Sequence, residues 1–185
     1  MKPLYKGLLL GALQIALVAS LGIKLLHDRA RCPRVWARTA NYDPDMPIRG
    51  RYVSLSVEVT PEGFSANDQQ PEKNQYGYYY GVYRKPVKLE VKEDKLVAVL
   101  SKEHEGSNIH ASPRVRYVQG KAIPSQEIYV DEPVAFFIPE HALNPAWLNR
   151  GEELWVEVTV PKKGPPRPIR LGIKKDKVLK PLNLD

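Results

Sequence analysis

Hydrophobic residues follow two different patterns along this chain, and the first is a continuous apolar run near the N-terminus. Residues 7–23 read GLLLGALQIALVASLGI and contain no charged side chain. Continuing across Lys24 to Leu26 gives about 20 residues, the length that a helix needs to cross a bilayer. The run is apolar on all sides rather than on one face, which is not typical of a helix in a soluble protein. It therefore predicts a transmembrane helix over residues 7–26, after a short tail at 1–6.

The second pattern is an alternation with a period of two, which begins at Arg51. From Val53 to Val59 apolar residues alternate with polar ones, as in a half-buried strand. Residues 87–100, VKLEVKEDKLVAVL, alternate on both sides of Glu93-Asp94-Lys95 and predict a hairpin. Many such short runs, together with 17 prolines, predict an all-β domain over residues 42–185, a sandwich or barrel-like fold of short antiparallel strands and hairpins. Residues 27–41 are then expected to be a basic juxtamembrane linker.

Two stretches in the first half of this domain each resemble a stretch in the second half. LSVEVTP (55–61) is similar to LWVEVTVP (154–161), and VKLEVKEDKLV (87–97) is similar to IRLGIKKDKVL (169–179). An internal duplication would produce this similarity. Convergence would also produce it, because exposed hairpins favour alternating arms and a charged turn. The sequence leaves both explanations open.

The net charge of +7 is concentrated near the N-terminus. Residues 1–38 hold seven basic residues and one acidic residue, Asp28, for a net charge of +6. The other 147 residues hold 21 basic and 20 acidic residues. A nearly neutral domain lacks the basic surface that binding to a phosphate backbone requires, so nucleic acid is not an expected partner.

The processing and orientation of the apolar segment are two separate questions. Lys2 and Lys6, the apolar run and the small residues 18–20 would also suit a cleavable signal peptide. The apolar residues continue past that site to Leu26, which favours an uncleaved signal anchor. The five basic residues at Lys24 and beyond favour a cytoplasmic domain by count, whereas an N-terminal hydrophobic segment is most often an export signal. We expect a periplasmic domain, with both questions open.

No residue pattern assigns a reaction or a cofactor. The stretch DPDMPIRG before the first strand has one glycine, whereas phosphate-binding loops need two or three. The four histidines are not in a metal-binding spacing, and Cys32 is the single cysteine. The sequence thus predicts no catalytic, cofactor-binding or metal-binding residue. Whether the protein is an enzyme stays open, with a non-enzymatic role favoured.

The tyrosine-rich run YGYYYGVY (76–83) is the candidate binding face. In a strand, Tyr76, Tyr78 and Tyr80 would share one side, with glycines leaving space on the other. Such rings could stack on a glycan, a peptide or a partner protein. The alternative is an ordinary strand, since aromatic residues are common in sheets.

GRYVSLSV (50–57) resembles the motif that names the bacterial GDYXXLXY protein family. Gly50, Tyr52 and Leu55 match it, while Arg51 replaces its aspartate and Val57 its last tyrosine. Asp43-Pro44 upstream resembles the family's DP pair. Downstream, Tyr129 and Phe137-Ile138-Pro139-Glu140 resemble its aromatic segment. The motif residues with expected structural roles are Asp43, Pro44, Gly50, Tyr52, Leu55, Phe137, Pro139 and Glu140.

The resemblance implies a bacterial membrane-anchored protein of unknown biochemical role, often encoded beside multi-span membrane proteins. Together with the apolar segment, it predicts a single-pass accessory or interaction protein of the bacterial inner membrane, with a periplasmic domain. A multi-span membrane protein is the expected partner. The alternative is an envelope enzyme or a small-ligand or glycan binder that uses Tyr76, Tyr78 and Tyr80.

Overall fold

The computed structural model describes residues 3–42, 52–64, 72–73, 79–80, 84–101, 109–118, 121–142, 144–145 and 147–184. At 3–4, 41–42, 72–73, 79–80, 114–118 and 121–126 this description covers the backbone alone. The chain forms two compact units, Met1–Cys32 and Pro33–Asp185. The first is a helix and the second is built from β-strands, so the predicted all-β domain preceded by one helix is confirmed.

The first unit consists of helix α1, Pro3–Arg31, which contains the predicted segment and extends beyond it. Its apolar side chains are exposed on every side, for example Leu9 at 69%, Ile15 at 72% and Val18 at 74%. The helix is long and apolar enough to cross a membrane, and no part of its apolar window is buried. In water this surface would be costly, because each buried apolar side chain of this size is worth about 1.5–3 kcal/mol.

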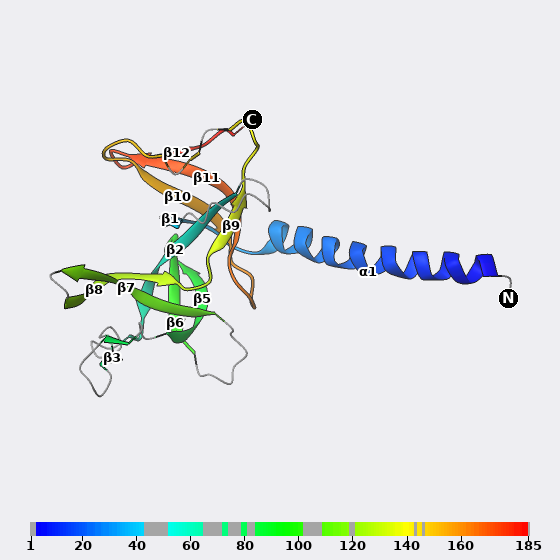
Figure 1. Ribbon diagram of the computed structural model, residues 1–185, viewed down its shortest axis with the longest axis horizontal. Coiled ribbons are helices and arrows are strands. Elements are labelled where there is room, and N and C mark those ends of the chain that lie inside the picture. Colours follow the sequence, from blue (N-terminus) through cyan, green and yellow to red (C-terminus); the bar gives the residue numbers. More distant parts are fainter. Residues whose placement is uncertain are drawn as a thin grey trace. The chain divides into compact units, whose positions relative to one another are not determined.

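The second unit contains the strands, which are labelled in Figure 1. Their bounds are β1 Arg34–Tyr42, β2 Tyr52–Glu62, β3 Glu72–Lys73, β4 Tyr79–Tyr80, β5 Lys85–Lys92, β6 Lys95–Leu100, β7 His110–Val118, β8 Lys121–Val130, β9 Val134–Phe137, β10 Glu153–Thr159, β11 Arg167–Lys175 and β12 Val178–Pro181. The main sheet has the order β12-β11-β10-β1-β2-β6-β5-β7-β8. β9 pairs with β2, and β3 pairs with β4 apart from this sheet.

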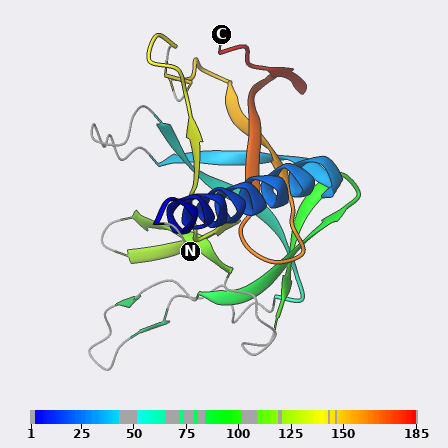
Figure 2. The same cartoon turned by 90° about the vertical axis from the view of Figure 1, so that its right-hand side faces the viewer.

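Strand β2 organises this unit because its two halves pair with different neighbours. Its first half pairs antiparallel with β1 on one side and with β9 on the other. Its second half pairs in parallel with β6 and antiparallel with β8. The pairings β2-β6-β5-β7-β8-β2 therefore close into a ring, while β1, β10, β11 and β12 continue the sheet from the other half. Figures 1 and 2 show β10–β12 extending away from the green strands β5–β8.

The core lies between these strands and is built from the predicted alternation. Leu55 and Val57 of β2 are fully buried, as are Val156 and Val158 of β10. Val87 of β5 and Ile128 of β8, whose strands belong to the ring, are fully buried as well. All residues of this core cluster belong to 33–185. The domain therefore holds a complete core of its own without α1.

The predicted linker at 27–41 is wrong. Residues up to Arg31 extend the helix, and Arg34–Tyr42 form β1 in the middle of the sheet. Val35, Ala37 and Thr39 are buried between β10 and β2, and they alternate with Trp36 and Arg38 on the other face. Trp36 and Arg38, which face outward, each combine an apolar part with a polar end. In the sequence, this strand therefore resembles a basic linker.

Both similar hairpins exist, but their strands are arranged differently. Each has a two-residue turn with positive φ, Glu93-Asp94 at 50° and 56°, and Asp176-Lys177 at 50° and 67°. β10 pairs directly with β11, the first arm of its hairpin, whereas β2 pairs with β6, the second arm of the other. A repeated sequence that adopts two different pairings supports convergence on one turn type over a repeated structural unit.

Candidate functional site: an aromatic and charged face over strand β1

The outer face of β1, β10 and β11 carries an unusual set of side chains. Residues two apart in a strand share a face, so the buried sets in these strands leave the intervening positions facing outward. These outward residues are Trp36 and Arg38 on β1, Glu153, Trp155 and Glu157 on β10, and Arg170, Gly172 and Lys174 on β11. Two indoles, three cations and two carboxylates thus lie on one face of three neighbouring strands.

Trp36 is fixed by its neighbours on the next two strands. It lies opposite Glu157, which in turn lies opposite Arg170. The Arg170 guanidinium is 5.4 Å from the centre of the Trp36 ring, and its Nε is 2.6 Å from Oε2 of Glu157. The ring extends over Gly172, where a Cβ atom would come within 3.0 Å of it. A side chain at 172 would therefore displace the indole.

Trp155 is held in a similar way on β10. Its indole nitrogen donates a hydrogen bond of 3.1 Å to the carboxylate of Glu153. The ammonium of Lys174 lies 4.1 Å from the ring centroid, within the range of a cation–π interaction. Trp155 is directly opposite Arg38, so the second indole continues the row onto β1.

Arg38 is the centre of the charged part of this face. Its guanidinium forms ion pairs with Glu127 at 3.2 Å, Glu153 at 3.3 Å and Glu58 at 3.6 Å. Burial opposes its charged form, but the charges of Glu153, Glu58 and Glu127 outweigh this and raise the pKa of Arg38. One cation thus joins strands β1, β2, β8 and β10.

Glu58 is a partly buried carboxylate of this group. Burial of the carboxyl raises its pKa, with Glu127 and Glu153 adding to this, although the charge of Arg38 acts in the opposite direction. Within the described part of the chain its Oε2 is buried and accepts no hydrogen bond. Glu58 can therefore accept a proton or a hydrogen bond from a ligand more readily than an exposed carboxylate.

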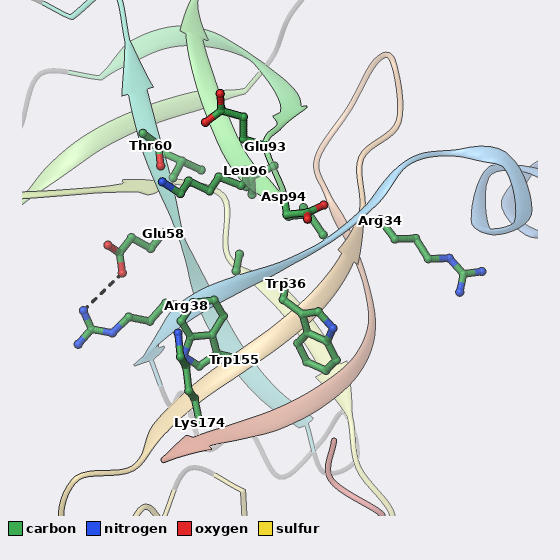
Figure 3. A pocket seen from close by; sticks show the side chains of 14 residues that line it. Arg34, Trp36, Arg38, Glu58, Thr60, Glu93, Asp94, Leu96, Trp155 and Lys174 are labelled. Atoms are coloured by element: carbon green, nitrogen blue, oxygen red, sulfur yellow. Dashed lines mark ion pairs between the residues drawn. The ribbon is translucent and has the colours of Figure 1, made fainter. Parts of the chain in front are cut away.

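A groove of about 700 Å³ lies along this face. Trp36, Trp155 and Lys174 line it together with Arg38 and Glu58, and the acidic turn Glu93-Asp94 of the β5–β6 hairpin lines it as well (Figure 3). Its volume is in the range of small-molecule sites. Flat aromatic surface beside donors and acceptors suits a polar ligand with one apolar face, or an amphipathic side chain of a partner protein.

The described residues that line the groove are mostly aromatic, charged or small apolar side chains. Among the described residues no group of three or more histidine, cysteine or acidic side chains could hold a metal ion. The groove residues include neither a serine or cysteine nucleophile nor a histidine base. The indoles and paired charges on this face could bind a ligand by stacking and by ion pairing.

The structure describes five of the motif residues, which lie in or directly after strands β2 and β9. Tyr52 begins β2 opposite Phe137, with their ring centroids 6.0 Å apart, and Leu55 is fully buried. Pro139 and Glu140 are exposed after β9, and Phe137 is 68% exposed. Asp43, Pro44 and Gly50 lie outside the described residues. The structure brings Tyr52 and Phe137 together, and neither lines the groove.

The predicted tyrosine face is untested. Tyr76 and Tyr78 lie outside the described residues, and Tyr80 is described as part of β4 by its backbone alone. Its role in binding therefore stays a prediction.

The sequence reasoning missed Trp36, Arg38, Trp155 and Lys174. The signal was present in RVWAR and ELWVE, where aromatic and charged residues occupy every second position opposite small or branched apolar ones. The prediction of a linker at 27–41 excludes RVWAR from the strands, and with it the half of this pattern that lies on β1. The pairing of β1 with β10, about 120 residues apart in the sequence, could not be read from either segment alone.

No family model, curated protein or solved structure matches this chain. The resemblance to the GDYXXLXY family therefore stays a prediction that rests on the quoted residues.

Proposed function

We propose that this chain is a single-pass membrane-anchored accessory protein whose β-domain binds a partner and performs no reaction of its own. The observation that carries this proposal is the direct continuation of an apolar helix into a self-contained domain. Only Cys32 and Pro33 separate the end of α1 from the start of β1. Such a short connection suits a domain that works close to the membrane surface.

The proposed location is the inner membrane of a bacterium, with the domain in the periplasm and a multi-span membrane protein as partner. The resemblance to the GDYXXLXY family supports the bacterial membrane and the partner. The N-terminal position of α1 supports export, because such segments are usually export signals. The basic residues that follow the apolar run count against this orientation, so reporter fusions at the C-terminus are needed to decide it.

The groove over β1 is the proposed binding surface. Tryptophan and arginine dominate the energetics of protein interfaces, and here Trp155 and Arg38 lie directly opposite each other. The volume of the groove favours a second candidate function, binding of a small polar ligand such as a glycan. In both cases the indoles supply apolar area and the carboxylates accept hydrogen bonds.

The test compares Trp155→Ala with Trp147→Ala in the full-length protein. Trp147 is 78% exposed and does not line the groove, so it is a matched control for loss of an indole. After crosslinking in intact membranes and detergent extraction, Trp155→Ala should reduce recovery of the crosslinked complex at least about 10-fold. Equal recovery from both variants and the wild type would contradict the proposed surface.

The anchor itself is tested by alkaline carbonate extraction of the membranes. An integral protein stays in the pellet, whereas a peripheral or secreted protein is released. Release of the full-length chain would contradict the anchor and leave the groove to be tested on the free domain.

A further inference from the structure

The loop between β10 and β11 presents two lysines on a restrained backbone. It contains the sequence PKKGPP at residues 161–166. Pro161 and Pro166 are buried at its two ends, while Lys162 and Lys163 are exposed between them. Three prolines restrict the backbone, and Gly164 takes the positive φ of 95° that closes the loop. The backbone of the loop is therefore already restrained, so that binding a partner through the two lysines would cost little further backbone entropy.

These lysines differ from several others in their surroundings. Lys92 pairs with Glu62 at 2.6 Å, Lys88 with Glu90 at 2.9 Å and Lys175 with Glu152 at 3.3 Å. The loop itself contains no acidic residue. Within the part of the chain that the structure describes, no carboxylate forms an ion pair with Lys162 or Lys163. Their charge is thus available to an anionic partner.

The loop is attached to the point where the chain enters the domain. The backbone N–H of Val160 donates a hydrogen bond of 3.0 Å to the carbonyl of Pro33. Arg34 then pairs with Thr159, and Thr159 pairs with Arg167 on the far side of the loop. The lysines therefore lie at the end of the sheet where the chain leaves α1.

Covalent geometry limits how far this entry point can be from a membrane that α1 crosses. Pro33 is the seventh residue after Leu26, which is the last residue of the apolar segment. At 1.5 Å per helical residue this is about 10 Å. The headgroup layer on each side of the hydrocarbon is roughly 5–8 Å thick. Pro33 would lie at the outer edge of the headgroups, and the lysines within about one Debye length of them.

We propose that the Lys162–Lys163 loop rests on the bilayer and binds the phosphate groups of anionic phospholipids. This inference rests on the proposed anchoring by α1. Contact at the loop would restrict the orientation of the domain relative to the membrane. Each basic residue close to an anionic surface raises the equilibrium constant for membrane contact about fivefold, so the two lysines together should favour the docked orientation about 30-fold.

The experiment uses the full-length protein with Cys32→Ser and Pro165→Cys, labelled with an environment-sensitive dye and inserted into nanodiscs. Pro165 is exposed beside the lysines, and Cys32 is the single native cysteine. Nanodiscs of phosphatidylcholine alone are compared with nanodiscs containing phosphatidylglycerol. Acrylamide is the quencher because it is neutral and is not repelled by anionic lipid.

In the anionic nanodiscs, quenching at 165 should fall at least about threefold, and Lys162→Gln/Lys163→Gln should restore it. The matched control is Lys177→Gln/Lys180→Gln, which removes two exposed lysines at the opposite end of β11 and should leave the protection intact. A dye at Arg150→Cys, near the start of β10 and thus at the same far end, should be equally quenched in both lipids.

Equal quenching at 165 in both lipids, in protein that is inserted, would overturn the lipid contact and leave the anchor standing. Equal loss of protection in the Lys162→Gln/Lys163→Gln and Lys177→Gln/Lys180→Gln variants would also overturn it, because the protection would then depend on the net charge of the domain and not on the loop. Failure of the chain to insert, seen as release by carbonate, would overturn the anchoring proposal and this inference with it.

Discussion

Gly172→Ala is expected to disturb the candidate site through a single added methyl group. A Cβ at this position would lie 3.0 Å from the carbonyl oxygen of Lys180 and 3.0 and 3.1 Å from two carbons of the Trp36 ring. All three contacts are closer than ordinary van der Waals packing allows. The Trp36 indole and the carbonyl of Lys180 must each give way by a few tenths of an ångström to admit the methyl group.

The expected cost follows from two opposing effects. Overpacking of this kind typically costs about 1–3 kcal/mol. Replacing a strand glycine by alanine returns roughly 0.5–1 kcal/mol, because the unfolded chain loses freedom. The midpoints of the two ranges leave a net loss of about 1 kcal/mol. For a domain of this length, that is a decrease in Tm of roughly 2–4 °C.

The assay is urea and thermal unfolding of a fragment covering residues 33–185, which holds the complete core cluster. A double-mutant cycle with Trp36→Leu separates the two contacts, since the shorter side chain removes the ring and leaves Lys180 in place. Gly172→Ala should cost less in the Trp36→Leu background, by about 1 kcal/mol. An identical cost in both backgrounds, or no cost in either, would refute the packing of Trp36 over Gly172.

Two further predictions concern the core and the charged cluster. Leu55→Ala should lower the free energy of unfolding by about 2–5 kcal/mol in urea titrations, because Leu55 is fully buried, whereas Leu100→Ala at a half-buried position should cost clearly less. Burial raises the pKa of Glu58 above its ordinary value of 4.5, so the native state binds its proton more tightly than the unfolded chain does. Stability should therefore fall as the pH rises from about 4.5 through the raised pKa, and Glu58→Gln should remove that part of the fall. Parallel pH profiles of stability for the variant and the wild type would contradict this assignment.

The parts of the fold that depend on local pattern could be predicted from the sequence. The apolar run at 7–26 is part of α1, and the alternation at Val53–Val59 is part of β2. The hairpin around Glu93-Asp94 is also correct, with both turn residues at positive φ. In each case the periodicity of a single segment determines the structure.

The parts that depend on pairing between distant segments could not be predicted. The sequence of β1 predicts a linker, because its short side chains, Ala37 and Thr39, give a weak hydrophobic signal and Arg38 indicates exposure to solvent. Its place in the sheet depends on β10 and β2 together. The candidate site depends on the same pairings, since Trp36 and Trp155 face one groove only when β1 lies beside β10.

The most direct test of the account is the intact mass of the protein recovered from carbonate-washed membranes. The account predicts the mass of the full chain, 21.0 kDa, because α1 stays attached and anchors the domain. Recovery of the protein in the carbonate supernatant instead, with a mass that lacks residues 1–20, would show that the segment is a cleaved signal peptide and would contradict the anchor.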